Sequence, residues 1–223
     1  DAFSDCSSLA NVIISNNVTE LVGIFSGCSS LTSVKIPNGV TNIAETFSGC
    51  SNLTSVKIPD GISEIGYRTF SGCRKLTSIK IPDSVTFIGR EAFSGSGLVD
   101  ISIPNSVEGT GGGVFAGCTD LKHFTLSDRI TSLDCGVNNG WDDGSGFFEY
   151  CTSLEEVVIP NSVTMIGEFT FKNCTNLSSI TIPNGVTDIG EGTFESCNAL
   201  TSIVIPNSIT SIKERTFYGC SSL

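Results

Sequence analysis

Apolar side chains recur along this chain in a pattern that repeats every 22 or 23 residues. In most repeats a phenylalanine is followed six residues later by leucine, and then by alternating valine and isoleucine. The interval between marker phenylalanines departs from this period once, between Phe115 and Phe148, where it is 33 residues. A fixed period of about 20 to 50 residues is typical of proteins that stack equivalent units, so the pattern predicts a solenoid. The marker phenylalanines are Phe3, Phe25, Phe47, Phe70, Phe93, Phe115, Phe148, Phe171, Phe194 and Phe217.

The segment that follows each marker phenylalanine predicts a short strand. In the unit that begins at Phe25, the apolar residues Leu31, Val34 and Ile36 precede Pro37. Alternation of apolar and polar residues is typical of a half-buried strand, and proline ends the strand because it has no N–H to donate. Stacking should place these strands side by side in one parallel sheet along a face of the solenoid.

A second apolar pair follows the proline in most units, and it predicts the opposite wall of the solenoid. Val40 and Ile43 form this pair in the unit of Phe25. We expect the segment that closes the unit, residues 45–50 in this example, to be an irregular or short helical turn.

The full consensus is F-x-G-C-x-x-L-x-x-V-x-I-P-x-x-V-x-x-I, and residues 25–43 match it throughout. This consensus resembles the BspA-type leucine-rich repeats and recurs over essentially the whole chain. The resemblance implies a β-rich solenoid, a right-handed leucine-rich-repeat superhelix of about ten units of 22–23 residues with one parallel sheet along a face. It also implies an extracellular or cell-surface protein used for adhesion and ligand binding, with no catalytic residues. It does not identify the ligand, because function depends on the site and not on the fold.

The repeat predicts one domain, a single solenoid over residues 1–223, because each unit touches only its neighbours. Solenoids normally end in polar caps, and neither end of this chain shows one. We therefore expect a fragment truncated within a repeat at both ends.

Two adjacent units depart from the pattern. The unit at Phe93 is one residue short, has Ser96 in the cysteine position, and carries a glycine-rich segment at 108–113. The next unit carries an insertion at about residues 134–146, and insertions in solenoids form loops on one face, often the binding face. After this insertion, Phe147 is an alternative to Phe148 as the core residue.

Charge excludes some classes of partner. The formal net charge is −11, with 12 Lys and Arg against 23 Asp and Glu. Nucleic acid is not an expected partner, because its phosphates must be neutralised by clustered Lys and Arg. The sequence contains no apolar run of about 18 residues, so we expect no membrane insertion of this segment. The sequence does not predict the oligomeric state.

Nine of the ten cysteines occupy one register, three residues after the marker phenylalanine. Stacking brings equivalent residues to about 5 Å from one another, which suits a disulfide, but the parallel Cβ directions of a regular stack disfavour that bond. The pattern favours a ladder of buried thiols, because free cysteine packs as a small apolar side chain. No C-x-x-C is present and His123 is the only histidine, so we predict no metal site and no cofactor.

The polar strand positions, eight and ten residues after the marker phenylalanine, should face solvent. Lys35, Lys57 and Lys80 occupy the tenth position of three consecutive units, and His123 occupies the eighth position of a later unit. Like charges on adjacent strands repel one another, so the lysine row is unfavourable for the fold itself. It also forms a basic stripe on an acidic protein, and this stripe predicts a site for an anion or an acidic partner. The alternative is that these solvated lysines keep a flat sheet soluble and prevent edge pairing.

The insertion supplies a second candidate contact region. It holds Trp141, the only tryptophan, beside Asp142 and Asp143. Tryptophan is enriched at binding hot spots. A calcium loop is a less favoured alternative, because the acids lack the alternating spacing of such loops. The remaining alternative is a tolerated loop without function.

Enzyme motifs are absent from the sequence. Residues 109–113 lack the Gly-Lys-Ser/Thr ending of a phosphate loop, and the outward acids Asp100 and Glu156 lie two units apart. We therefore predict no enzyme. The leading hypothesis is a surface or secreted adhesion module that binds a host or matrix protein or glycan through the sheet face and the 134–146 loop. The alternative is a passive spacer that holds another domain away from the cell surface.

Overall fold

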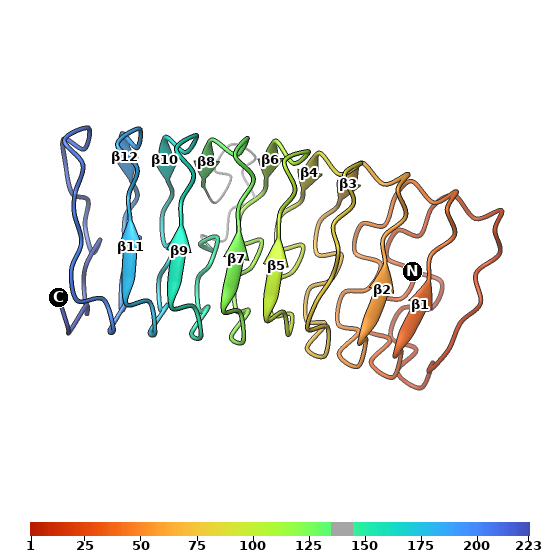
Figure 1. Ribbon diagram of the computed structural model, residues 1–223. Helices are drawn as coiled ribbons and strands as arrows, with labels where there is room; N and C mark the ends of the chain where they lie inside the picture. The colour runs from red at the N-terminus through yellow and green to blue at the C-terminus, as the bar shows by residue number, and fades with distance from the viewer. Residues whose placement is uncertain (135–144) are drawn as a thin grey trace.

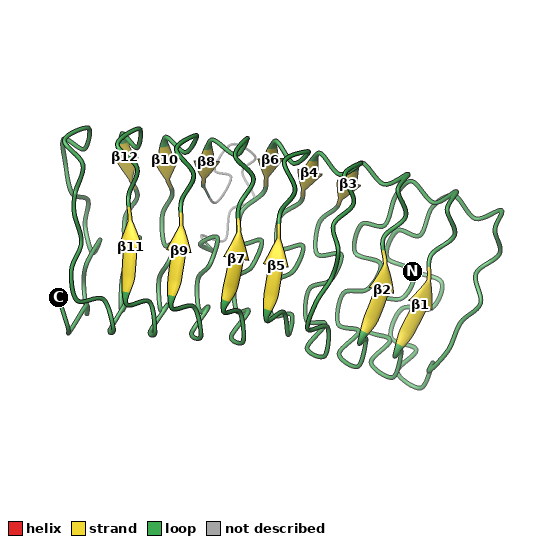
Figure 2. Cartoon of the chain, in the orientation of Figure 1, coloured by secondary structure: helices red, strands yellow, loops and turns green. Residues whose placement is uncertain are grey.

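The protein forms an elongated solenoid in which successive turns of the chain lie side by side (Figure 1). The computed structural model describes residues 1–134 and 145–223. Strands and turns build the described part, and it contains no helix (Figure 2). The strands form in the short apolar segments of the units, though not in every unit. On one face each strand ends two residues before a proline, as the sequence predicts, except after Thr125, where Ser127 stands in the proline position.

Three-residue strands line one long face, which we call the strand face. Each carries one inward apolar side chain between two outward ones. These strands are β1 (Ser33–Lys35), β2 (Ser55–Lys57), β5 (Asp100–Ser102), β7 (His123–Thr125), β9 (Glu156–Val158) and β11 (Ser179–Thr181).

The strand face is parallel, as predicted, but it is not one continuous sheet. Its strands pair as β1 with β2, β5 with β7 and β9 with β11, giving three separate two-stranded sheets in the described part. About six turns are regular enough to form a strand here, so the expected count of about ten regular units is too high. The fourth unit, for example, places Ser78–Lys80 on this face without forming a strand.

Two-residue strands form the opposite wall, as the second apolar pair predicts. They pair in parallel in the order β3-β4-β6 and, separately, β12-β10-β8. The division between β6 and β8 coincides with the two units that depart from the repeat, where Thr110 takes an apolar position opposite Ile88. These strands are β3 (Glu64–Ile65), β4 (Phe87–Ile88), β6 (Gly109–Thr110), β8 (Ser132–Leu133), β10 (Met165–Ile166) and β12 (Asp188–Ile189).

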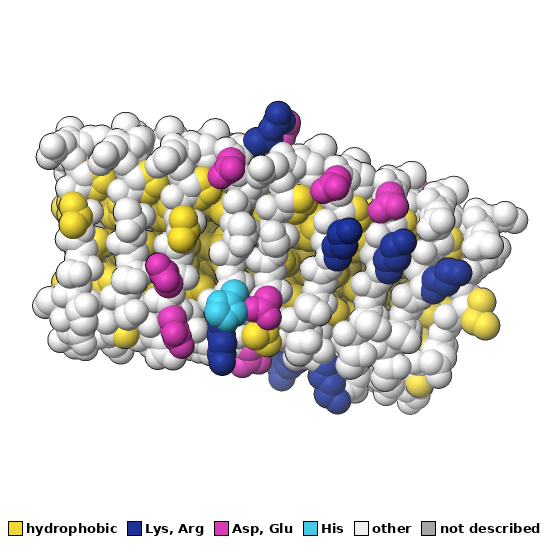
Figure 3. Space-filling view, viewed as in Figure 1, with side chains coloured by type: hydrophobic (Ala, Val, Ile, Leu, Met, Phe, Trp, Pro, Cys, Tyr) yellow, Lys and Arg dark blue, Asp and Glu magenta, His cyan; other side chains and the backbone are white. Residues whose placement is uncertain are grey.

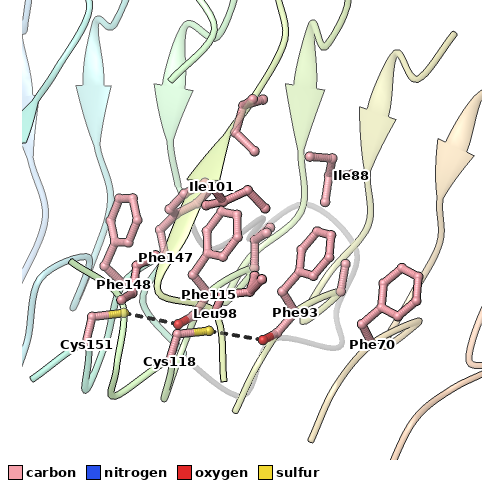
Figure 4. Packing of buried hydrophobic residues seen from close by; sticks show 14 of the residues in the cluster. Phe70, Ile88, Phe93, Leu98, Ile101, Phe115, Cys118, Phe147, Phe148 and Cys151 are labelled. Atoms are coloured by element: carbon pink, nitrogen blue, oxygen red, sulfur yellow. Dashed lines mark hydrogen bonds between the residues drawn. The ribbon is translucent and has the colours of Figure 1, made fainter. Parts of the chain in front are cut away.

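A column of stacked phenylalanines runs through the core (Figure 4). Neighbouring rings lie nearly parallel, with centroids from 5.5 Å apart at Phe70–Phe93 to 6.1 Å at Phe25–Phe47. Phe148 stacks on Phe115 across the insertion at 5.9 Å, so Phe148 keeps the core position and Phe147 does not replace it. Phe147 is also buried and meets the Phe115 ring edge-on at 62°. Burying one such ring stabilises the fold by roughly 1.5–3 kcal/mol.

A ladder of cysteine thiols lies beside the phenylalanine column. Each thiol from the second unit onward donates a hydrogen bond to the carbonyl of the marker phenylalanine one turn earlier, as Cys118 does to Phe93 at 3.1 Å and Cys151 to Phe115 at 3.2 Å (Figure 4). All nine cysteines in the described part are free, so the predicted thiol ladder is confirmed and the disulfide alternative is wrong. Ser96 replaces one thiol, and its hydroxyl lies 3.3 Å from the Cys118 sulfur.

The turn that closes each unit is irregular and not helical. Glu45 and Gly49 both have positive φ, at 56° and 71°, a region that glycine adopts without strain. Backbone hydrogen bonds join this corner to the next turn, from Phe47 N to Thr69 O at 3.0 Å and from Gly49 N to Ser71 O. The corner therefore contributes to the stacking of the turns although it forms no strand.

Candidate functional site

The outward side chains of β1 and β2 form the first part of the candidate site. Ser33 pairs with Ser55 and Lys35 with Lys57 in a parallel register, and all four side chains are exposed while Val34 is buried between them. The prediction that the eighth and tenth positions face solvent is confirmed here.

Lys80 extends the row from the next turn, where it is exposed but outside any strand. Basic side chains follow one another across this part of the strand face (Figure 3). Among the described residues, none of Lys35, Lys57 and Lys80 forms an ion pair, whereas Lys213 binds Asp188 at 2.9 Å. Adjacent like charges are destabilising, so the row costs stability and leaves its charges available to a partner.

A hollow of about 590 Å³ lies beside Lys80, between the turns of β2 and β5. Its floor is apolar, formed by Val56, Ile79, Ile81 and Pro104. Its rim is polar, formed by Thr54, Ser55, Ser78, Lys80, Asp83 and Ser102. An apolar floor with a few convergent polar groups is typical of ligand sites. We call it the lysine hollow.

The strand face changes polarity beyond the lysine hollow. Asp100 on β5 and His123 on β7 are register partners, and His123 Nε2 lies 3.9 Å from Asp100 Oδ1. Their side chains are 61% and 79% exposed, so this pair contributes little to stability. Glu156 occupies the same position on β9. The structure thus places His123 on the strand face, as predicted, but among acids and away from the lysine row.

A second hollow, of about 500 Å³, is lined by residues of β9 and β11 and by Asp128 in the turn that follows β7. Its floor is again apolar, with Val157, Ile159 and Ile180, but its rim carries the carboxylates of Asp128 and Glu156 and no lysine. We call it the acidic hollow. The two hollows share one construction and differ in the charge of their rims.

The candidates in the insertion lie outside the described residues. Trp141, Asp142 and Asp143 fall within 135–144, so their contact role stays a prediction. Residues 1–134 and 145–223 hold no group of three His, Cys, Asp or Glu side chains arranged to bind a metal ion.

The buried thiols are packing groups. Burial raises the pKa of Cys50 to about 12, with a smaller contribution from the neighbouring Cys28. Burial also raises the pKa of Cys118 to about 11, against the opposing effect of the Ser96 hydroxyl hydrogen bond. A thiol is nucleophilic only as the thiolate, so these cysteines are unsuited to covalent chemistry.

The structure shows features that the sequence argument missed. The lysine hollow depends on Ser102, which only the stacking brings beside Lys80, and on Asp83, which the turn after Pro82 places at its rim. At the closing corner, Glu91 is 6% exposed and binds Arg68 at 2.6 Å. The sequence could have predicted this ion pair. Arg68 and Glu91 each stand two positions before a marker phenylalanine in adjacent units, so stacking brings their opposite charges together.

The model of the "BspA type Leucine rich repeat region" matches six copies, over residues 1–45, 43–137 and 144–223. The chain belongs to the BspA-type leucine-rich-repeat family. No protein in the curated set matches it. Leucine-rich-repeat solenoids of this kind are typically non-catalytic. The described part contains no helix long and apolar enough to span a membrane.

Three solved structures of bacterial leucine-rich-repeat proteins are similar to this chain. A leucine rich cell surface protein of Faecalibacterium prausnitzii is 31% identical, with a TM-score of 0.65, and the match covers 100% of this chain and 67% of that one. A leucine-rich-repeat protein of T. pallidum is 31% identical, with a TM-score of 0.60 and coverages of 82% and 72%. A third, from Eubacterium ventriosum, is 25% identical with a TM-score of 0.68, and the match covers 92% of this chain and 63% of that one.

Proposed function

We propose that this BspA-type solenoid is an extracellular interaction module that binds a negatively charged host or matrix partner through the lysine row of its strand face. The observation that carries the proposal is the row itself. Lys35, Lys57 and Lys80 follow one another on adjacent turns, exposed and without ion pairs among the described residues, on a chain of net charge −11.

The electrostatics support a partner-binding role for this row. A local positive field on an otherwise acidic protein orients an acidic partner toward one half of the strand face. Complementary charge raises the association rate and selects the partner, and adjacent apolar surface adds affinity. The adjacent lysine hollow supplies that apolar surface.

The location outside the cell is part of the proposal. The F. prausnitzii relative is a leucine rich cell surface protein, and the match to it covers 100% of the present chain and 67% of that one. We extend that location to the present protein. We also propose the segment at 134–146 as a second contact region, because it is an insertion in the repeat and carries Trp141 beside Asp142 and Asp143.

The test is a binding screen against extracellular-matrix proteins and anionic glycans, with a Lys35→Glu/Lys57→Glu/Lys80→Glu variant. Three exposed ion pairs contribute about 1–3 kcal/mol together, so the variant should bind about 5- to 160-fold more weakly. The matched control is Arg74→Glu/Lys75→Glu/Lys122→Glu, which makes the same charge change at exposed positions outside the row. Full affinity in the first variant, or equal loss in both, would overturn the role of the row. No binding by the parent protein would favour the spacer alternative.

A further inference from the structure

We infer that the lysine hollow binds an anionic sugar residue of a glycan, with the sugar's carboxylate or sulfate against Lys80 and Lys57. This inference rests on the proposed function and names the partner chemistry at the same site. The shape, the polar rim and the charge of the hollow each contribute to it.

The shape of the hollow suits a sugar ring. Its volume of about 590 Å³ lies within the range of about 300–1,000 Å³ that is usual for small-molecule sites. The floor offers the apolar side chains of Val56, Ile79 and Pro104. A pyranose ring presents C–H groups on one face and hydroxyls around its edge, so it matches an apolar floor inside a polar rim.

The polar rim distinguishes a sugar from an acidic peptide. Ser55, Ser78 and Ser102 carry hydroxyls, which both donate and accept hydrogen bonds. The carboxylate of Asp83 only accepts, so it requires a ligand that donates. Sugar hydroxyls are such donors. An acidic peptide donates only through its backbone N–H groups, and its carboxylates would be repelled by Asp83.

The charge of the rim selects an anionic sugar over a neutral one. Lys80 lines the hollow, and Lys57 occupies the equivalent position on the adjacent turn. Both ammonium groups lack ion pairs among the described residues. A charge-assisted hydrogen bond to sulfate or carboxylate is stronger than a neutral one.

The acidic hollow provides an internal contrast on the same face. Its apolar floor of Val157, Ile159 and Ile180 resembles the floor of the lysine hollow. Ser179 and Ser78 are equivalent residues, because each stands eight positions after the marker phenylalanine of its unit. Its rim carries Glu156 and Asp128, which repel an anion. The anionic sugar should therefore bind only at the lysine hollow.

The test uses the whole chain and three probes: chondroitin sulfate hexasaccharide, neutral maltohexaose and poly-L-glutamate. The key variant is Ser78→Phe, which fills the lysine hollow and leaves every lysine in place. We expect chondroitin sulfate to bind, maltohexaose not to bind, and Ser78→Phe to weaken chondroitin sulfate binding about tenfold or more. Poly-L-glutamate should bind through the lysine charges alone. Its affinity for Ser78→Phe should therefore differ from its affinity for the parent protein by less than about twofold.

Ser179→Phe is the matched control, because it places the same side chain in the acidic hollow. It should leave the affinity for chondroitin sulfate unchanged, and thermal melting should show that both variants are folded. Unchanged chondroitin sulfate binding in Ser78→Phe would overturn the inference. Lysine-dependent binding of poly-L-glutamate without binding of chondroitin sulfate would also overturn it, while leaving the proposed function intact. Binding of neither anion would overturn both.

Discussion

Lys35 on β1 and Lys57 on β2 are direct register partners, and both side chains face solvent. A parallel pair brings such side chains within about 5 Å of each other, so the two positive charges repel. The fold therefore holds a destabilising arrangement on its strand face. The same arrangement gives an acidic partner two cations at one step of the solenoid.

The first prediction concerns the cost of this row. Lys57→Glu places a negative charge between Lys35 and Lys80, which replaces two repulsions with attractions, so the free energy of unfolding should rise by about 0.5 kcal/mol. Urea unfolding at low salt measures the change, and about 1 M salt should remove most of it. Lys122→Glu makes the same charge change outside the row and should give no gain. A loss of stability in Lys57→Glu would contradict the prediction.

The second prediction concerns the phenylalanine column. Phe148 lies between Phe115 and Phe171 and is fully buried, so Phe148→Ala should lower the free energy of unfolding by about 3–5 kcal/mol. Phe3 is 43% exposed and stacks on one side only, so Phe3→Ala should cost much less. Denaturant unfolding of both variants is the measurement. Equal losses would show that the column does not stabilise the fold as described.

The third prediction concerns thiol reactivity. In a Cys135→Ser background, an alkylating reagent at about pH 8 should label the exposed Cys6 within minutes in the native protein. The half-buried Cys220 should react more slowly, because burial raises the pKa of its thiol. The buried thiols should react only after unfolding, because burial both excludes the reagent and raises their pKa. Mass spectrometry of the labelled peptides reads the result. Rapid labelling of Cys73 or Cys151 in the folded chain would contradict the buried ladder.

The fourth prediction concerns alkaline pH. In the unfolded chain these thiols ionise near 9.0, while burial raises the pKa of Cys50 and of Cys197 to about 12 in the folded chain. Their stabilising contribution is complete below about pH 9 and is lost as pH rises from about 9 to 12, because the unfolded state releases protons that the folded state retains. Unfolding free energies measured at several pH values should therefore fall over this interval.

A variant isolates the alkaline effect. Cys50→Ala removes one shifted thiol, so its stability should fall less steeply with pH above about 9 than that of the parent. Ser33→Ala, at an exposed position without a titrating group, is the control and should leave the slope unchanged. Identical slopes in all three proteins would show that buried thiols do not cause the alkaline loss.

Much of the fold could be predicted from the sequence, because the repeat fixes which residues are equivalent. The spacing of Phe, Leu and Pro predicts the strands, and the shared register of the cysteines predicts the thiol ladder. The division of the strand face was not predictable in this way. Ser78–Lys80 keep the sequence pattern of Ser55–Lys57 and still form no strand, because pairing depends on how neighbouring turns sit and not on the unit alone.

The candidate site was predictable only in part. The outward position of Lys35, Lys57 and Lys80 follows from strand alternation, and the structure confirms it. The lysine hollow does not follow, since Asp83 and Ser102 belong to a turn and to a different unit. Concave surfaces depend on small offsets between stacked turns. A repeat consensus does not specify these offsets, because it describes only what the units have in common.

The division of the opposite wall between β6 and β8 has a mechanical consequence. A solenoid behaves as a row of units joined by nearest-neighbour contacts, so tension along its length acts on every junction equally and the weakest opens first. At this junction the two-residue strands do not pair. The β5–β7 strand pair, the Phe115–Phe148 stack and the Glu108–Arg129 ion pair are among the contacts that remain. Tension should therefore separate the opposite wall here first, while the β5–β7 pair still joins the two turns on the strand face.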